Sequence, residues 1–247
     1  MSGIEWQETK EYKPVEKSIK KFCQEKNIAP EQINRISGLV SFIESRALEG
    51  LHDYLAHDLK REHGGVLVGQ PFFDCEENRY FIDIRAAIPA LETEGNEVHL
   101  QFTPQSWSYI SGIIEENFPD QVILGWFHSH PGLGVFMSGT DRATQSAFFR
   151  SPWNVAIVVD PVAKKTGWFS SSQCEPMDRN HVIAYENPAL ENSFEREPLP
   201  PSTVPTENMP STSWRKLGWL LPFAGVMIVA GVAGIWFMKR KNHNRSA

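Results

Sequence analysis

Two histidines, placed two residues apart at the end of an apolar run, are the feature that most limits how this chain can fold. Residues 122–127, Val-Ile-Leu-Gly-Trp-Phe, predict a strand that is buried on both faces. In an extended backbone, the side chains at positions i and i+2 point to the same side of the sheet. His128 and His130 can therefore converge on one ion, whereas Ser129 points away.

A serine and an aspartate three residues apart follow, after a loop rich in proline and glycine. Ser138 suits the N-cap of a helix predicted over residues 139–149, and Asp141 falls in its first turn. Two imidazoles and one carboxylate are a natural ligand set for zinc, with the fourth tetrahedral position left to water. A structural zinc site would close that position with another side chain, so the sequence favours a catalytic centre.

The pattern His-Ser-His, seven residues, Ser, two residues, Asp resembles the JAMM signature of the MPN+ (Mov34/MPN/PAD-1) metalloproteases. That family also needs an upstream glutamate, in the form Glu-x-x-Gly-x-x-x-Gly at the start of a strand. Glu62, Gly65 and Gly69 supply it with matching spacing. The resemblance covers roughly residues 36–170 and implies an α/β (α+β) domain, with a curved mixed β-sheet flanked by helices.

The resemblance also implies a role for each matching residue. One zinc ion per chain would be held by His128, His130 and Asp141. Glu62 would take a proton from the attacking water and pass it to the leaving amine, and the Ser138 hydroxyl would donate to the developing oxyanion. The family's usual substrate is an amide or isopeptide bond at the C-terminus of ubiquitin or a ubiquitin-like protein, so such a conjugate is the expected partner.

Two other functions stay open at this point. One is a peptidase that trims a small sulfur-carrier protein or another non-ubiquitin substrate. The other is a membrane-anchored MPN scaffold or adaptor that binds partners without catalysis. Such domains typically lack motif residues, and all five are present here. His63 is a small departure, since relatives more often carry an aliphatic residue there.

Helices and strands interleave along residues 36–185, the predicted metalloprotease domain. Residues 1–35 are rich in Lys, Glu and Gln, with Val15, Ile19 and Phe22 at near-helical spacing. We expect them to form a solvated N-terminal extension with room for a short amphipathic helix. Strands are predicted over 36–43, 66–68, 80–88, 100–102, 122–127, 153–160 and 167–170, helices over 45–61, 105–117 and 139–149, and a mobile loop over 91–98.

The C-terminal part of the chain has a different composition. Residues 186–214 hold six prolines among polar residues, which predicts a disordered linker. Residues 217–238 carry no charge and would span about 33 Å as a helix, which predicts a single transmembrane helix within a basic segment, 215–247. The start of the chain has no apolar stretch of the secretory type, so we expect the catalytic domain in the cytoplasm. The basic residues after 238 favour the opposite orientation.

The net charge argues against nucleic-acid binding, and the spacing of the cysteines argues against a disulfide or zinc-ribbon framework. The formal net charge is -6, and the six Lys and Arg residues from 215 onward leave -12 on residues 1–214. An acidic domain of this kind argues against nucleic acid as the partner. Cys23, Cys75 and Cys174 are widely spaced, so they predict neither a disulfide framework nor a zinc ribbon.

Overall fold

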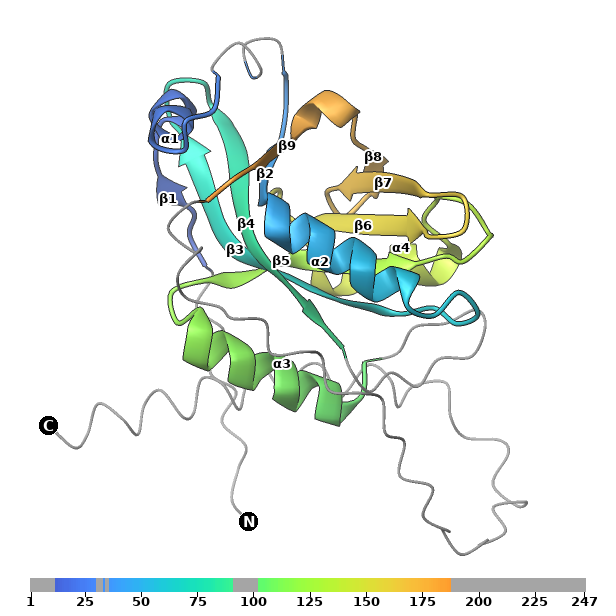
Figure 1. Cartoon of the computed structure of the whole chain (residues 1–247). Helices are drawn as coiled ribbons and strands as arrows, with labels where there is room; N and C mark the ends of the chain where they lie inside the picture. Colours follow the sequence, from blue (N-terminus) through green and yellow to red (C-terminus); the bar gives the residue numbers. More distant parts are fainter. Residues whose placement is uncertain (1–11, 30–32, 34–35, 91–101, 188–247) are drawn as a thin grey trace, which may run out of the picture. The chain divides into compact units, whose positions relative to one another are not determined.

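The computed structural model of this chain describes residues 12–29, 33, 36–90 and 102–187 (Figure 1). Its strands are β1 (Val15–Glu16), β2 (Val40–Glu44), β3 (Gly64–Asp74), β4 (Arg79–Pro89), β5 (Val122–Ser129), β6 (Val155–Asp160), β7 (Lys165–Ser170), β8 (Glu175–Pro176) and β9 (Val182–Tyr185). Its helices are α1 (Ile19–Glu25), α2 (Ser45–Ala56), α3 (Pro104–Asn117), α4 (Gly139–Phe148) and the 3-10 helix η2 (Arg179–His181).

The strands form one mixed sheet in the order β8-β7-β6-β5-β3-β4-β2-β9, and β1 pairs with β3. The central strand β3 runs antiparallel to both β4 and β5, whereas β5 and β6 are parallel. The sheet is strongly twisted, and helix α2 lies along one of its faces (Figure 1). A curved mixed sheet flanked by helices is the fold class that the sequence predicts, and the structure confirms it.

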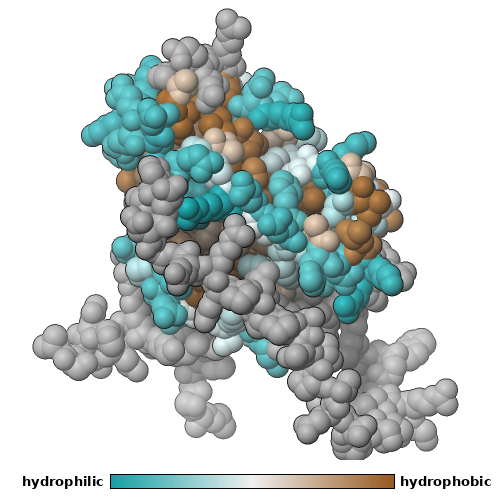
Figure 2. Space-filling model, viewed as in Figure 1, coloured by the Kyte–Doolittle hydropathy of each residue, from teal (hydrophilic) through white to brown (hydrophobic). Residues whose placement is uncertain are grey.

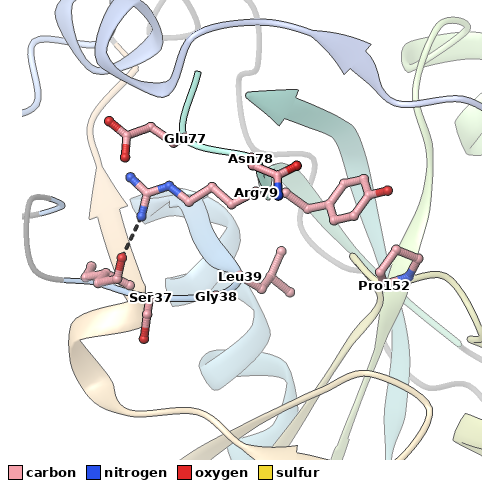
Figure 3. Close-up of a pocket in the computed structure, with 9 residues that line it drawn as sticks. Ser37, Gly38, Leu39, Glu77, Asn78, Arg79 and Pro152 are labelled. Carbon is pink, nitrogen blue, oxygen red and sulfur yellow. Dashed lines mark hydrogen bonds between the residues drawn. The ribbon is translucent and has the colours of Figure 1, made fainter. Parts of the chain in front are cut away.

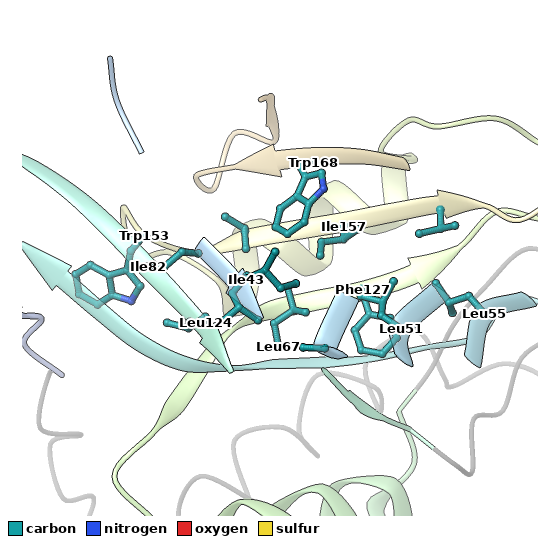
Figure 4. Packing of buried hydrophobic residues seen from close by; sticks show 14 residues of the cluster. Ile43, Leu51, Leu55, Leu67, Ile82, Leu124, Phe127, Trp153, Ile157 and Trp168 are labelled. Atoms are coloured by element: carbon teal, nitrogen blue, oxygen red, sulfur yellow. The ribbon is translucent and has the colours of Figure 1, made fainter. Parts of the chain in front are cut away.

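Helix α2 supplies the middle of the main hydrophobic core. Its Leu51 and Leu55 are buried in one cluster with Leu67 of β3, Phe127 of β5 and Trp168 of β7 (Figure 4). The leucines recur every three or four residues, so one side of the helix is apolar, and that side is turned to the sheet. Burying a leucine or phenylalanine fully contributes about 1.5–3 kcal/mol, so this contact holds α2 in place.

Strand β5 divides its side chains between two cores. Phe127 belongs to the cluster under α2, whereas Trp126 lies with Phe149 in a second cluster on the opposite face. Both edges of β5 are hydrogen-bonded, one to β3 and one to β6. The approach to β6 is so close that a Cβ at Gly125 would lie 1.8 Å from the carbonyl oxygen of Val155. A glycine at this position is therefore required by the register that carries the histidines.

Helix α2 ends at Ala56, earlier than the predicted residue 61. Asp58 gives the reason, because its Oδ1 accepts the backbone N–H of Lys60 at 2.8 Å and its Oδ2 accepts from Arg61 Nε at 3.1 Å. An aspartate that bonds to the backbone two residues further on favours a turn over a helix. Glu62 consequently lies in the loop between α2 and β3, not at a helix end.

Part of the expected N-terminal extension packs into the domain. Ile19, Phe22 and Cys23 of α1 are at most 1% exposed and join a cluster with apolar side chains of β2, β3, β4 and β9. The Asp74 carboxylate accepts the backbone N–H of Ile19 at 2.8 Å, and β1 adds a parallel pairing to β3. The short amphipathic helix that the spacing of Ile19 and Phe22 indicates is present as α1, but the expectation that this segment is a solvated extension is corrected, because the apolar side of α1 is buried in the domain.

Several predicted elements are confirmed with small shifts at their ends. The helices predicted over 105–117 and 139–149 are α3 and α4, and residues 167–170 lie in β7, which forms a hairpin with β6. The predicted loop 91–98, the linker from residue 188 onward and the segment 217–238 lie outside the described residues. Among the residues that are described, no helix is long and apolar enough to cross a membrane. The membrane anchor stays a prediction.

The packing of α1 leads to a stability prediction. Phe22→Ala should lower the free energy of unfolding by about 3–5 kcal/mol, because it empties a fully buried aromatic site. Lys21→Ala, at an exposed position of the same helix, should change it by no more than about 0.5 kcal/mol. Urea unfolding of the two variants measures both values. Equal midpoints would show that α1 does not belong to the cooperative unit.

Candidate metal centre

Three buried side chains from two elements converge at one end of the sheet. His128 lies at the end of β5, His130 is the first residue after this strand, and Asp141 lies in the first turn of α4. Their exposures are 0%, 2% and 8%. One ligand atom from each lies within 4.8 Å of the others. The alternation along β5 and the helix after the loop thus bring the three residues together, as the spacing of the motif predicts.

The distances within this group suit a tetrahedral zinc ion. Asp141 Oδ2 lies 3.4 Å from His128 Nε2 and 3.5 Å from His130 Nε2. Zinc–ligand bonds of about 2.0–2.2 Å at tetrahedral angles place neighbouring ligand atoms about 3.4 Å apart. The carboxylate oxygen therefore already stands at the separation from each imidazole that a shared zinc ion needs.

The protonation and bonding of the group also fit a metal. Both ring nitrogens of His128 and the Nδ1 of His130 are buried. Within the described residues, none of these three atoms has a hydrogen-bond partner. Burial lowers the pKa of His128 and favours the neutral imidazole, which is the form that binds metals. Burial raises the pKa of Asp141, but the two histidines outweigh it and hold the pKa well below its usual range.

Glu62 reaches the same place from the loop before β3. Its Oε1 lies 3.5 Å from His130 Nε2, and the residue is 4% exposed. The pairing of β3 with β5 explains the position, since Gly64 lies opposite His128. Burial lowers the pKa of His130, but Asp141 and Glu62 outweigh it, so the net shift is upward. A second carboxylate thus stands beside the three candidate ligands.

Ser138 and Asp141 form a capping box at the start of α4. Ser138 Oγ accepts the backbone N–H of Asp141 at 3.2 Å, and the backbone N–H of Ser138 donates to Asp141 Oδ2 at 2.7 Å. The predicted N-cap is therefore confirmed. The serine hydroxyl still has its own hydrogen to donate, because accepting a bond uses only a lone pair.

Ser129 points away from the two histidines, as the alternation predicts. Its Oγ accepts the backbone N–H of His63 at 3.0 Å, and its own N–H donates to the His63 carbonyl at 2.8 Å. His63 is the residue directly after Glu62. These two bonds tie the loop that carries the glutamate to the strand that carries the histidines.

Several residues that support the site were not found from the sequence. The Trp126 ring stacks on His128 at 4.3 Å, and its Nε1 donates to Gln145 Oε1 of α4 at 2.8 Å. Phe136, in the loop before α4, lies 4.7 Å from the His130 ring. Trp126 is buried, as a strand buried on both faces predicts, but its orientation against His128 depends on Gln145 of α4, which lies further along the chain. No local pattern in the sequence reports such contacts.

Two further histidines and a cavity lie outside this group. His63 contacts Asp58 at 3.1 Å and His52 contacts Thr166 at 2.9 Å, so neither joins the metal group. A cavity of about 370 Å³ lies at the turn between β3 and β4, where Arg79 donates to the carbonyl of Ile36 (Figure 3). This turn is at the opposite end of β3 from Glu62, about 30 Å along the strand. The cavity is therefore separate from the metal group.

Comparisons with known proteins agree with this geometry. Residues 39–151 match the family model described as JAB1/Mov34/MPN/PAD-1 ubiquitin protease. COP9 signalosome complex subunit 5 is 38% identical over 78 residues in Caenorhabditis elegans, 30% of this chain and 21% of that protein. The Drosophila melanogaster protein of the same name is 34% identical over 103 residues, 40% of this chain and 29% of that protein.

Ubiquitin carboxyl-terminal hydrolase RPN11 of Saccharomyces cerevisiae is 39% identical over 56 residues, 22% of this chain and 18% of that protein. A solution structure of a protein from Desulfitobacterium hafniense aligns with a TM-score of 0.41 and 18% identity, over 60% of this chain and 94% of that one. The chain spans less than a third of the length of these curated relatives. What they share with it supports a JAB/MPN domain.

The ligand geometry predicts one zinc ion per purified chain. Asp141→Ala should lower the zinc content strongly, because only two protein ligands remain. His52→Ala, which removes a histidine outside the group, should keep the wild-type content. Elemental analysis of both proteins, after dialysis against the same buffer, decides the point. Full zinc occupancy in a variant that lacks all three ligands would place the metal elsewhere.

Proposed function

We propose that this chain is a zinc-dependent metallo-isopeptidase or peptidase that hydrolyses an amide or isopeptide bond at the C-terminus of ubiquitin or a ubiquitin-like protein. The observation that carries the proposal is the convergence of His128, His130 and Asp141 with Glu62 in one buried group. Three ligands leave one tetrahedral position open, and a neighbouring carboxylate is what hydrolysis by water requires. Similarity to proteins named as ubiquitin hydrolases supports the class of substrate.

The residues divide the chemistry between them. A zinc ion on the three ligands would lower the pKa of a water ligand towards neutrality and polarise the substrate carbonyl. Glu62 accepts a proton from the attacking water and delivers it to the leaving amine. It can do so because its carboxylate stands at the edge of the ligand group, 3.5 Å from His130 Nε2, and is shielded from solvent.

Ser138 supplies the remaining polar group. Its hydroxyl lies at the N-cap of α4, three residues before the ligand Asp141, and can donate to the oxygen that gains charge during attack. The cap bond holds the side chain in one rotamer, so the donor is oriented before substrate binds.

Exposed apolar side chains beside the site fit a protein substrate. Phe136, whose ring contacts His130, is 44% exposed, and Leu133 and Val162 are each 55% exposed. In Figure 2, hydrophobic residues gather at the right edge of this face, over the β6–β7 turn and the loop after β5. Apolar patches of this kind mark surfaces that bind other proteins. A folded modifier could dock there while its C-terminus enters the site.

Substrate class is tested by incubating the full chain with a panel of ubiquitin-like conjugates and short peptides, with and without a zinc chelator. Chelator-sensitive cleavage of a conjugate is the expected result. If only peptides or small sulfur-carrier fusions were cleaved, the chain would instead be a peptidase that trims non-ubiquitin substrates. Zinc binding without any cleavage would favour the scaffold.

Glu62→Gln separates the chemistry from metal binding. The amide keeps the size of the side chain but is no base, so kcat should fall by about two to four orders of magnitude while zinc content stays at the wild-type value. Glu44→Gln is the matched control, since Glu44 is also buried, at 3%, and belongs to β2. Its kcat per folded molecule should be unchanged. If Glu62→Gln retained both zinc and kcat, Glu62 would have no part in the mechanism.

Ser138→Ala tests the oxyanion donor. It should retain zinc and lose about 3 kcal/mol of transition-state stabilisation in kcat/KM. The lost cap should also cost about 1 kcal/mol of folding stability. Thr103→Ala removes the same kind of cap from α3, where Thr103 accepts the N–H of Ser106 at 3.1 Å, and should lower stability alone. Equal kcat/KM values for the two variants would assign Ser138 to the helix cap only.

A further inference from the structure

We propose that Asp160, the last residue of β6, is a positioning residue for the metal centre that holds the loop after His130 in place. The inference deepens the proposed function and rests on it. The hydrogen bonds of Asp160 within the described residues are to backbone N–H groups and not to a candidate ligand atom. Its influence passes through the backbone of residues 132–134.

One carboxylate binds four backbone N–H groups from two segments. Asp160 Oδ1 accepts from Gly132, Val162 and Ala163, each at 3.0 Å, and Oδ2 accepts from Gly134 at 2.9 Å. The side chain is buried, with 2% exposure. Hydrogen bonds to an ionised acceptor are about twice as strong as neutral ones. Asp160 thus joins the loop after β5 to the turn between β6 and β7.

The loop after β5 contains two glycines in an uncommon backbone conformation. Gly132 and Gly134 have φ values of +71° and +91°, a conformation that other residues rarely adopt. Both of these glycines are bound by Asp160. In Figure 1 the loop after β5 passes close to the end of β6, where Asp160 lies. The carboxylate therefore selects one conformation of a segment that glycine would otherwise leave free.

The connection to the metal ligand runs through Val159 and Leu133. The backbone N–H of His130 donates to the carbonyl of Val159, the residue before Asp160, at 2.8 Å. The His130 carbonyl in turn accepts the backbone N–H of Leu133 at 3.2 Å, and Leu133 lies between the two glycines that Asp160 binds.

A histidine that binds a metal through Nε2 usually donates its other N–H to a carbonyl or carboxylate, which fixes the ring. The Nδ1 of His130 is buried and has no hydrogen-bond partner within the described residues. The orientation of this ring therefore depends on the backbone of His130 and of the residues directly after it. Asp160, by fixing Gly132 and Gly134, limits how that backbone can move.

Asp74 offers a matched control at the other end of the sheet. It is 1% exposed and accepts three backbone N–H groups, from Ile19 at 2.8 Å, Glu76 at 2.9 Å and Glu77 at 3.1 Å. It also ends a strand, β3, and organises the turn after it. Replacing either aspartate by asparagine preserves shape but turns an amide towards N–H donors, so both changes cost stability. Within the part of the chain that the structure describes, the hydrogen bonds of Asp74 go to Ile19, Glu76 and Glu77 and none reaches a candidate metal ligand.

The experiment compares zinc affinity in Asp160→Asn and Asp74→Asn, using the full chain in competition with a chromophoric chelator. The measurements are made well below the unfolding temperature of each protein. We expect both variants to unfold at lower temperature, and Asp160→Asn alone to bind zinc about tenfold more weakly, a typical effect of removing an outer partner. Zinc affinity in Asp160→Asn equal to that of wild type or of Asp74→Asn would overturn the proposal.

A second variant covers the case in which Asp160→Asn does not fold. Gly134→Ala keeps the carboxylate, and its added Cβ has no atom within 4 Å, so it disturbs only the backbone at φ +91°. It should also weaken zinc binding, and an unchanged affinity would overturn the proposal. Because affinity is measured without substrate, a wild type that binds zinc but cleaves no conjugate would overturn the proposed function alone.

Discussion

The pairing between the start of β3 and the end of β5 is the contact on which the whole site depends. Gly64 lies opposite His128, and Ser129 exchanges hydrogen bonds with His63 through its side chain and its N–H. This ladder brings Glu62 beside His130, although the two are far apart in sequence. A slip of one residue would turn the histidines to the opposite face, away from Asp141. The register therefore determines the chemistry.

Strand β5 meets this requirement because both of its faces are buried. Phe127 enters the core under α2, while Trp126 and His128 face α4. The same alternation that fills two cores thus places an imidazole in a buried site, where burial lowers its pKa and favours its neutral form. The stacked Trp126, fixed by Gln145, limits the rotation of that ring. The alternation of side chains along β5 therefore sets both the packing of the two cores and the orientation of His128.

Short-range sequence patterns predicted that His128 and His130 converge and that Ser129 points away from them. They also predicted the N-cap at Ser138 and the order of most helices and strands. These features depend on side-chain periods of two or on capping chemistry, which a short window of sequence contains. The packing of α1 and the role of Asp160 were missed. Each depends on partners more than twenty residues away, such as Asp74 for Ile19 and Gly132 for Asp160. No short window of sequence contains both partners.

Asp141 shows how the helix prepares the metal site. Its Oδ2 accepts the Ser138 N–H at 2.7 Å and is also the oxygen that lies 3.4 and 3.5 Å from the two imidazole nitrogens. The capping box therefore fixes the rotamer of the carboxylate before any metal binds. Ordering a side chain costs free energy, and here folding of α4 has already met that cost. A site organised in this way would bind an ion with little rearrangement, because β5 and α4 hold the candidate ligands in place.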